Sequence, residues 1–422
     1  MRKTILIPLM VLLGGMGLQA QTILRIDSCM QWARDNYPLV RQQQLIERSR
    51  DLSVENASKG QLPQLSVGGQ ASYQSEVTRL GINLPGFTPP ELSKDQYRLY
   101  AEVNQPLTDL QTINRQKELL RSTGEVEKQK LEVELYKLKE RVTQLFFGIL
   151  LMREQEKQVE LMMADITAGL DKTQVAVDNG TATRTNIYLL EAELVKAKQR
   201  RKEMAATRES YEEMLSLFTG KQFSGSVILE KPVLLTENTE STEMRRPEIK
   251  LYELQQTNLG LQEKILKAKN WPRFSLFLQG GVGRPALNML SNELDPYYIG
   301  GLRLGWNIGQ LYTQKADRQL IHLQQQTVVL QKETFLLNTK LSLSQQDGEI
   351  RKYQSLINGD QELISLREKI KKTSQLQLEN GIITANDYIT YVNAEDQARQ
   401  GLLLHEVQLL MVRFGRELVK GY

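Results

Sequence analysis

Apolar residues recur at helical spacing through most of the chain. In the first half a seven-residue pattern continues for forty residues, interrupted only by Glu156, through Leu131, Leu135, Leu138, Val142, Leu145, Ile149, Met152, Val159, Met163, Ile166 and Leu170. In the second half the same step returns at Leu323, Leu330 and Leu337, and after a slip of one residue at Ile350, Ile357 and Ile364. A sustained seven-residue apolar repeat is typical of long helices that pack side by side as coiled coils.

The prolines mark where those helices can lie. All twelve fall within residues 1–20, 38–106, 232–247 and 272–296. Because proline breaks the interior of a helix, the pattern predicts long helices over residues 109–178 and 310–379. At 1.5 Å per residue each would be roughly 100 Å long.

Each predicted helix ends in the same kind of turn. A helix-stop signal is followed by a good N-cap residue twice, as Asn179-Gly180 with Thr183 and as Asn380-Gly381 with Thr384. The two signals lie 201 residues apart, and so do Asn186 and Asp387. We therefore predict hairpin tips at both places, each leading into a returning helix, over residues 183–218 and 384–419.

Between the helical segments the apolar period changes to two. Residues 62–74, 96–106, 273–282 and 297–307 alternate apolar with polar side chains, which is typical of strands with one apolar face. Aromatic side chains near the strand ends suit a girdle at a membrane interface: Tyr73, Tyr97, Trp271, Phe274, Tyr298 and Trp306. The alternative for these segments alone is a half-buried hairpin in water.

The chain therefore divides into two repeats of one plan. Residues 21–218 and 247–422 each comprise a short helix, two strands, a long helix and a returning helix, and residues 219–246 connect them. Pro38 and Pro247 lie 209 residues apart, as do Pro63 and Pro272. The predicted fold class is mainly α with a small β part, built from long antiparallel helical hairpins and four strands.

The N-terminus has the features of an export signal. Arg2 and Lys3 precede an apolar run, and residues 1–20 end in a small residue before Gln21. No later apolar run has the length of a transmembrane helix, so entry into a membrane would require strands. Cys29 is the only cysteine, so no intramolecular disulfide can form, and a buried place on a helix is favoured over lipidation.

The residues give little indication of nucleic-acid binding, metal binding or catalysis. The net charge of +4 is spread without a basic block, which argues against nucleic-acid binding. His322 and His405 lie alone in helical stretches, so neither a metal site nor a catalytic triad is expected. The glycines of residues 280–285 lead into a loop and not into a helix, which disfavours a phosphate cradle. We expect no enzyme activity, cofactor or metal.

Four strands cannot close a barrel in a membrane, because each open edge would leave backbone groups unpaired in lipid. Cyclic association of identical copies solves this problem. Three copies would supply twelve strands, a number within the range of outer-membrane barrels.

The sequence as a whole resembles the TolC-type outer-membrane efflux proteins. The resemblance rests on the duplicated strand–helix plan over residues 24–419, the strand starts "LPQLSVGG" and "WPRFSLFLQGG", and the two "NG-x-x-T" tips. It implies a homotrimer with a transmembrane β-barrel in the outer membrane of a Gram-negative-type bacterium and a helical tunnel in the periplasm. Such trimers are passive exit ducts in tripartite efflux or type I secretion systems. They serve an inner-membrane resistance-nodulation-division (RND) pump or ABC transporter through a periplasmic adaptor.

The resemblance also assigns roles to the tips. Asp387 matches an acidic, cation-selecting position at the periplasmic entrance, whereas Thr390 and Asn186 stand where further acids are common. Leu378 and Ile383 occupy the places of an aromatic and a basic gate residue, so an ion-pair latch is in doubt. Adaptor docking is assigned to the tip turns, at Asn179, Gly180, Thr181, Thr183, Arg184, Asn380, Gly381, Ile382, Ile383 and Thr384.

Two alternatives stay open. Asp387 also suits the first turn of a helix, where the dipole favours an acid. A periplasmic coiled-coil adaptor or scaffold without a pore would also contain helical hairpins.

Overall fold

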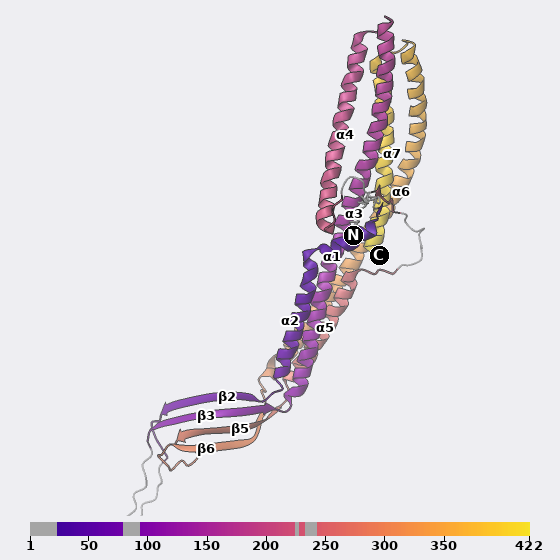
Figure 1. The fold of residues 1–422 in the computed structure, drawn as a ribbon. Coiled ribbons are helices and arrows are strands. Elements are labelled where there is room, and N and C mark those ends of the chain that lie inside the picture. The colour runs from indigo at the N-terminus through magenta and orange to yellow at the C-terminus, as the bar shows by residue number, and fades with distance from the viewer. Residues whose placement is uncertain (1–22, 79–92, 224–227, 233–242) are drawn as a thin grey trace, which may run out of the picture. The chain divides into compact units, whose positions relative to one another are not determined.

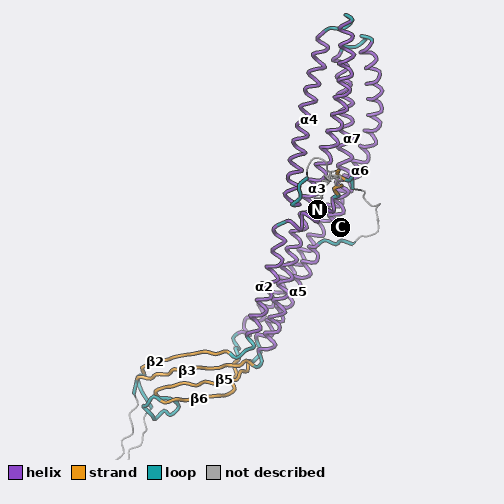
Figure 2. Tube along the Cα trace, viewed as in Figure 1, coloured by secondary structure: helices purple, strands orange, loops and turns teal. Residues whose placement is uncertain are grey.

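The computed structural model describes residues 23–78, 93–223, 228–232 and 243–422. Helices make up most of them, together with one four-stranded sheet (Figures 1 and 2). The predicted export signal lies outside the described residues.

Four helices dominate the chain. They are α3 (Asp109–Asp178) and α6 (Gln310–Glu379), each of 70 residues, and α4 (Arg184–Thr219) and α7 (Ala385–Lys420), each of 36. We call α3 with α4 the first hairpin and α6 with α7 the second hairpin. Every start and end of the second hairpin lies 201 residues after its counterpart, since 109 + 201 = 310 and 184 + 201 = 385.

Shorter elements precede each pair of strands. The first half has α1 (Ile26–Asn36), a 3₁₀ turn η1 (Pro38–Arg41) and α2 (Gln42–Lys59), and the second half has α5 (Pro247–Lys269). Pro247 lies in the first turn of α5, where its missing N–H leaves no helical bond unmade. Two short parallel strands, β1 (Ile23–Leu24) and β4 (Ile228–Leu229), join the N-terminal region to the connector. The sequence contained no alternating signal for either.

The main sheet joins both repeats. Its strands are β2 (Gln64–Tyr73), β3 (Asp95–Pro106), β5 (Arg273–Arg284) and β6 (Asp295–Gly305), all antiparallel in the order β2-β3-β5-β6 (Figure 1). The central pair, β3 with β5, brings together strands from different halves of the chain. The predicted fold class, mainly α with four strands in two repeats, is confirmed.

The chain forms two compact units, and neither coincides with a repeat. Of the described residues, unit 1 comprises 23–37, 138–223, 228–232 and 345–418, and unit 2 comprises 38–78, 93–137, 243–344 and 419–422. Both α3 and α6 contribute residues to both units. Within the described ranges, no helix is long and apolar enough to cross a lipid bilayer.

Unit 1 contains two apolar clusters. One surrounds α1, where Cys29 is fully buried and burial raises the pKa of its thiol to about 12. Phe146 and Phe147 of α3 fill the same cluster, with their rings 5.9 Å apart in an edge-on arrangement. The other cluster lies along the tip-side part of the hairpins, around Ile166, Leu190 and Tyr388.

Candidate functional site

The two hairpin tips have the same backbone turn. Gly180 and Gly381 adopt positive φ angles of 73° and 68°, the left-handed conformation that glycine takes without strain. The amide of Thr181 donates to the carbonyl of Ala176, and the amide of Ile382 donates to that of Gln377, both at 2.8 Å. The two glycine amides donate to carbonyls three residues back, those of Val177 and Leu378, both at 3.0 Å. Together these bonds form the Schellman ending of a helix.

The second tip continues into a reciprocal cap. The amide of Thr384 donates to the carboxylate of Asp387 at 3.0 Å, and the amide of Asp387 donates to the Thr384 hydroxyl oxygen at 3.2 Å. The same hydroxyl donates to the Asp387 carboxylate at 2.7 Å. Hydrogen bonds from the Thr384 side chain and backbone hold the pKa of Asp387 below its ordinary value. Asp387 is therefore ionised at the start of α7, where the helix dipole favours an anion.

The first tip lacks this cap. Thr183 lies at the N-cap position of α4 with extended backbone, but its side chain makes no capping hydrogen bond, contrary to the capping role expected from its residue type. The backbone amide of Asn186 donates to the backbone carbonyl of Thr183 at 3.1 Å. Arg184 is the first residue of α4. On the second hairpin, Thr390 is exposed, and its hydroxyl donates to the backbone carbonyl of Asn386 at 2.9 Å.

Side chains next to the second tip enter the core. Leu378 is 7% exposed, and Ile383 packs against the same cluster. Tyr388 of α7 is buried against Gly169 of α3, where a Cβ atom would lie 2.6 Å from the tyrosine ring. The Tyr388 hydroxyl donates to the carbonyl of Asp165 at 3.2 Å, and burial raises its pKa to about 12. The places expected for gate residues are thus part of an apolar contact.

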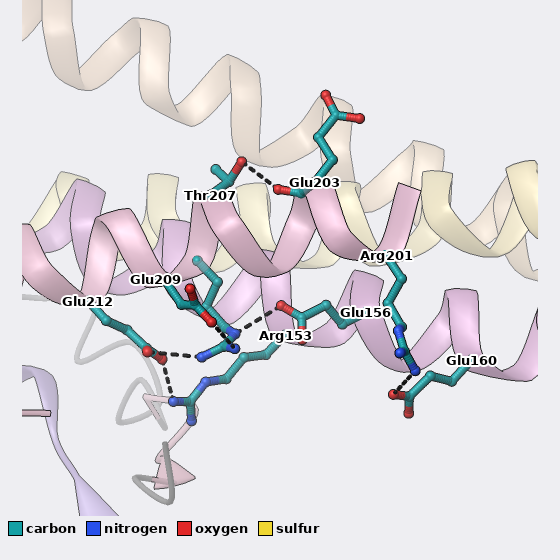
Figure 3. Close-up of polar contacts among 9 residues, drawn as sticks. Arg153, Glu156, Glu160, Arg201, Glu203, Thr207, Glu209 and Glu212 are labelled. Carbon is teal, nitrogen blue, oxygen red and sulfur yellow. Dashed lines mark hydrogen bonds and ion pairs between the residues drawn. The ribbon is translucent and has the colours of Figure 1, made fainter. Parts of the chain in front are cut away.

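An ion cluster holds the first hairpin together within unit 1. Glu156, the interruption in the apolar repeat, accepts a hydrogen bond from Arg208 of α4 at 2.9 Å (Figure 3). Arg208 also pairs with Glu212 at 2.9 Å, and Arg153 of α3 reaches the same carboxylate at 2.6 Å. These side chains are at most 21% exposed, so the polar residue at an apolar position is explained by a buried partner on the facing helix.

A second ion cluster, which the sequence did not predict, involves α7. Glu395, with its side chain 3% exposed, pairs with Lys371 of α6 at 2.7 Å and with Arg399 at 2.6 Å. Lys371 also pairs with Asp165 of α3 at 2.7 Å. The available signal was an acid in helical phase with apolar residues, since Tyr388, Val392 and Glu395 step by four and three.

The main sheet has one apolar and one polar face. Alternate residues on the apolar face are exposed, among them Leu65, Val67, Leu99, Leu276, Leu278, Leu302 and Leu304. Of the predicted aromatic girdle, Tyr73 ends β2, Tyr97 and Phe274 lie within three residues of strand starts, and Trp271 and Trp306 flank β5 and β6. Tyr298 lies further in, opposite Gly280. Whether these residues meet a membrane stays a prediction.

The apolar repeat of α6 is exposed in unit 2. Leu323, Leu330 and Leu337 are 57%, 61% and 58% exposed. Residues at the intervening heptad positions are exposed as well: Leu320, Thr327, Thr334 and Leu341. The two threonine hydroxyls donate to backbone carbonyls one turn back, at Leu323 and Leu330. We call these seven residues the α6 seam.

Comparison with known proteins gives a match in structure but not in sequence. No protein-family model matches the chain, and no curated protein matches it. The outer-membrane channel OprN superposes with a TM-score of 0.69 at 14% identity, covering 94% of this chain and 89% of OprN. The outer-membrane protein VceC of Vibrio cholerae gives 0.67 at 12%, covering 94% and 96%. The open state of the Neisseria gonorrhoeae MtrE outer-membrane channel gives 0.66 at 15%, covering 94% and 88%.

These similarities concern the fold. Nearly the whole of this chain and of each channel is superposed, so the strands, the long helices and both repeats are shared. The chain has the fold of TolC-type outer-membrane channels, as the sequence resemblance implied.

Proposed function

We propose that this protein is the outer-membrane channel-tunnel of a tripartite efflux or type I secretion system. The main sheet is the observation that carries the proposal. In the described part of the chain β2 and β6 each have one neighbouring strand, and one face of the sheet is exposed and apolar. A sheet of this kind is stable in a membrane only when other strands cover both edges. Three copies closing a twelve-stranded barrel meet that requirement.

The α6 seam supports association of copies by a second route. Heptad leucines that stay exposed in one chain form a surface suited to a helix of another chain. On α2, Leu45 and Leu52 lie seven residues apart and are 69% and 47% exposed. Packing of the α6 seam against α2 of the next copy is a head-to-tail contact, which closes into a ring when repeated.

The remaining assignments rest on the fold and the tips. We place the sheet in the outer membrane of a Gram-negative-type bacterium and the helical hairpins in the periplasm. The tip turns, with Ile382 exposed and Asn179 and Asn380 at the helix ends, are the surface for a periplasmic adaptor. An RND pump or an ABC transporter would deliver the cargo.

Asp387 is proposed to select cations at the entrance. Its carboxylate is ionised and lies on the first turn of α7 beside the tip. Three copies around one axis would produce a negative potential focused on the path of the ions. The cap formed with Thr384 fixes the carboxylate and leaves its charge in place.

Single-channel recording of the purified trimer in a planar bilayer tests the function. We expect steady, cation-preferring openings and a detergent-solubilised mass of three chains. Leu330→Lys should prevent assembly and abolish openings, whereas Lys340→Leu, at an exposed position outside the α6 seam, should leave both unchanged. A protein that stays monomeric and dissolved without detergent would instead support a periplasmic scaffold.

A further inference from the structure

Two exposed indole rings lie at the end of the main sheet that joins the helices. The apolar-face alternation of Leu302 and Leu304 in β6 continues to Trp306, whose indole N–H donates to the carbonyl of Asn270 at 3.0 Å. This bond places the turn between α5 and β5 beside the edge of the apolar face. Trp271 in that turn is 59% exposed, and Trp306 is 52% exposed. We call this place, where α5, β5, β6 and α6 meet within unit 2, the helix-side rim.

Five exposed cations lie on α5 and α6 next to the helix-side rim. We call them the rim patch; they are Lys264, Lys267 and Lys269 near the end of α5, and Lys315 and Arg318 near the start of α6. The two helices are adjacent here, because Glu263 of α5 pairs with both Lys267 and Arg318 at 2.9 Å. Glu263 and Asp317 are the acids among these residues, so five positive and two negative charges leave a net charge of +3.

Three cations of the rim patch are not neutralised by an acid. Among the described residues, no carboxylate lies within ion-pair distance of Lys264, Lys269 or Lys315. The helix dipole favours cations in the last turn of a helix, which accounts for Lys267 and Lys269. It does not account for Lys315, which lies near the start of α6, the end of a helix that favours acids. Helix stability alone therefore does not explain the positive charge at the helix-side rim.

The equivalent places in the first repeat are not basic. At the offset of 209, the three lysines of α5 correspond to Glu55, Ser58 and Gly60, and at the offset of 201 Lys315 corresponds to Asn114. The loop between β5 and β6, residues 285–294, contains one acid and neither Lys nor Arg. The positive charge thus belongs to the helix-side end of the second repeat, and neither to its loop end nor to the equivalent place in the first repeat.

We propose that the rim patch binds the phosphate headgroups of anionic phospholipids in the leaflet that meets the helix-side end of the sheet. The inference rests on the proposed function, which places the sheet in the outer membrane and the helices in the periplasm. Acyl chains then cover the apolar face, and Trp271 and Trp306 lie at the level of the headgroups. The lysines reach the phosphates because their long side chains extend toward the interface. The neighbouring indole rings favour a lipid surface over an acidic protein as the partner.

The attraction has a measurable size. Each Lys or Arg near an anionic lipid surface raises the affinity about fivefold. Salt weakens this attraction, because it screens charges that are exposed to water. We therefore expect the helix-side rim to prefer an anionic over a zwitterionic lipid by about fivefold or more at low salt, and to lose most of this preference at high salt.

Quenching of tryptophan fluorescence by brominated lipids measures this preference at the helix-side rim itself. The chain has three tryptophans; Trp271 and Trp306 lie at the rim, and Trp32→Phe removes the third. The protein is reconstituted in phosphatidylcholine vesicles that contain increasing fractions of either brominated phosphatidylglycerol or brominated phosphatidylcholine. Brominated phosphatidylglycerol should reach half-maximal quenching at an about fivefold lower fraction, and molar salt should remove the difference.

Two variants with the same change of charge separate the rim patch from the rest of the chain. The rim variant neutralises the three unpaired lysines, with Lys264→Gln, Lys269→Gln and Lys315→Gln. The control variant removes the same charge from exposed lysines of α4 in unit 1, with Lys196→Gln, Lys198→Gln and Lys202→Gln. The ratio of the two half-maximal fractions should fall to about one in the rim variant and should keep the parent value in the control variant.

The outcomes distinguish this inference from the proposed function. Equal quenching by both brominated lipids in the parent, a preference that persists in the rim variant, or an equal loss in the control variant would overturn the inference and leave the sheet in the membrane. If the rim variant does not enter vesicles, Lys315→Gln alone replaces it; a partial loss of preference is expected, and an unchanged ratio would count against the proposal. Absence of quenching by either lipid in the parent would refute the placement of the sheet in a membrane, and with it the duct.

Discussion

The two long helices have the same length and the same place in their repeats, yet they differ in what covers them. In α3 the apolar repeat is buried within the chain, with Leu131, Leu135 and Val142 at most 4% exposed. In α6 the leucines of the α6 seam are more than half exposed. Only from Ile350 onward does α6 contribute a few buried apolar residues. α3 therefore supplies buried apolar residues to both units, whereas the α6 seam supplies an exposed surface of unit 2.

A heptad pattern therefore indicates that a helix packs against another helix, but not which helix that is. Leu323, Leu330 and Leu337 correspond to Ser122, Gln129 and Tyr136 in the first repeat at the offset of 201. The two seams thus lie on different faces of equivalent helices. Duplication preserved the lengths of the elements while their apolar faces diverged, as expected if one face meets the same chain and the other a neighbouring copy.

The largest expected effect comes from the same substitution on both helices. Leu135 and Leu330 belong to unit 2 and are 4% and 61% exposed. Leu135→Ala should lower the free energy of unfolding by about 2–5 kcal/mol, since it leaves a cavity. Leu330→Ala should change the unfolding of an isolated chain by less than about 0.5 kcal/mol. Denaturant unfolding of monomeric protein in detergent measures both.

Association should respond in the opposite order. Leu330→Ala removes apolar area that the neighbouring copy would cover, a loss of about 1.5–3 kcal/mol per contact. Leu135→Ala should leave the trimer's dissociation constant close to the parent value wherever the chain is folded. Equal trimer stability in Leu330→Ala and the parent, by native mass spectrometry, would mean that the α6 seam faces something other than a second copy.

Much of the fold could be predicted from the sequence, because turns and helix ends depend on the residues that form them. Proline positions, the Asn-Gly stops and the change of apolar period from seven to two depend on a few neighbouring residues. Strand order and the partners of each helix do not. Nothing local in α6 distinguishes a seam that meets the same chain from one that stays exposed, and the two-residue strands β1 and β4 are too short to carry a period.

A smaller effect is expected from two adjacent acids that the first repeat lacks. Glu395 and Asp396 correspond to Leu194 and Val195 of α4. Burial tends to raise the pKa of Glu395, but hydrogen bonds and charges from Lys371 and Arg399 outweigh it and the pKa lies below its ordinary value. Burial dominates at Asp396, whose pKa is raised. The pKa values of two neighbouring carboxyls on one helix are thus shifted in opposite directions.

The two shifts predict opposite dependences on pH. The stabilisation from Glu395 is present above its ordinary pKa and is lost as the pH falls through its lowered pKa. The cost of ionised Asp396 is present above its raised pKa and disappears as the pH falls through that pKa. Glu395→Gln should therefore be less stable than the parent at neutral pH, by on the order of 1–3 kcal/mol. Asp396→Asn should be as stable or more stable, an advantage that fades on acidification.

Thermal unfolding between neutral and acidic pH distinguishes these variants from the parent. The difference in melting temperature between Glu395→Gln and the parent should shrink toward low pH, because protonation of Glu395 removes the same interaction from the parent. Glu212→Gln serves as the comparison from the first hairpin, where the acid lies between two arginines. Identical pH profiles for Glu395→Gln and Asp396→Asn would contradict the opposite shifts.

The site was less predictable than the fold, for a physical reason. The turn residues Gly180 and Gly381 and the pair Thr384 with Asp387 follow from local chemistry, and the structure has them in the expected turns. The roles expected for the tips, Asp387 among them, stay predictions. The buried pair of Arg200 with Asp396 links positions 196 residues apart, so no local pattern announces it. An acid in phase with apolar residues signals only that some partner must exist.

The smallest expected effect exchanges the residues that differ between the two tips. Asp387→Asn removes the charge at the second tip but leaves an amide able to accept from Thr384, so assembly should be preserved while cation selectivity falls. Asn186→Asp places a carboxylate at the equivalent position of the first tip, where Thr183 makes no side-chain cap. Reversal potentials in a salt gradient measure both. If the entrance responds to total charge, the double exchange should restore the parent selectivity; if only the second tip lines the path, Asn186→Asp should have no effect and the double exchange should match Asp387→Asn. Selectivity unchanged in all three would remove Asp387 from the ion path and leave it as the N-terminal acid of α7.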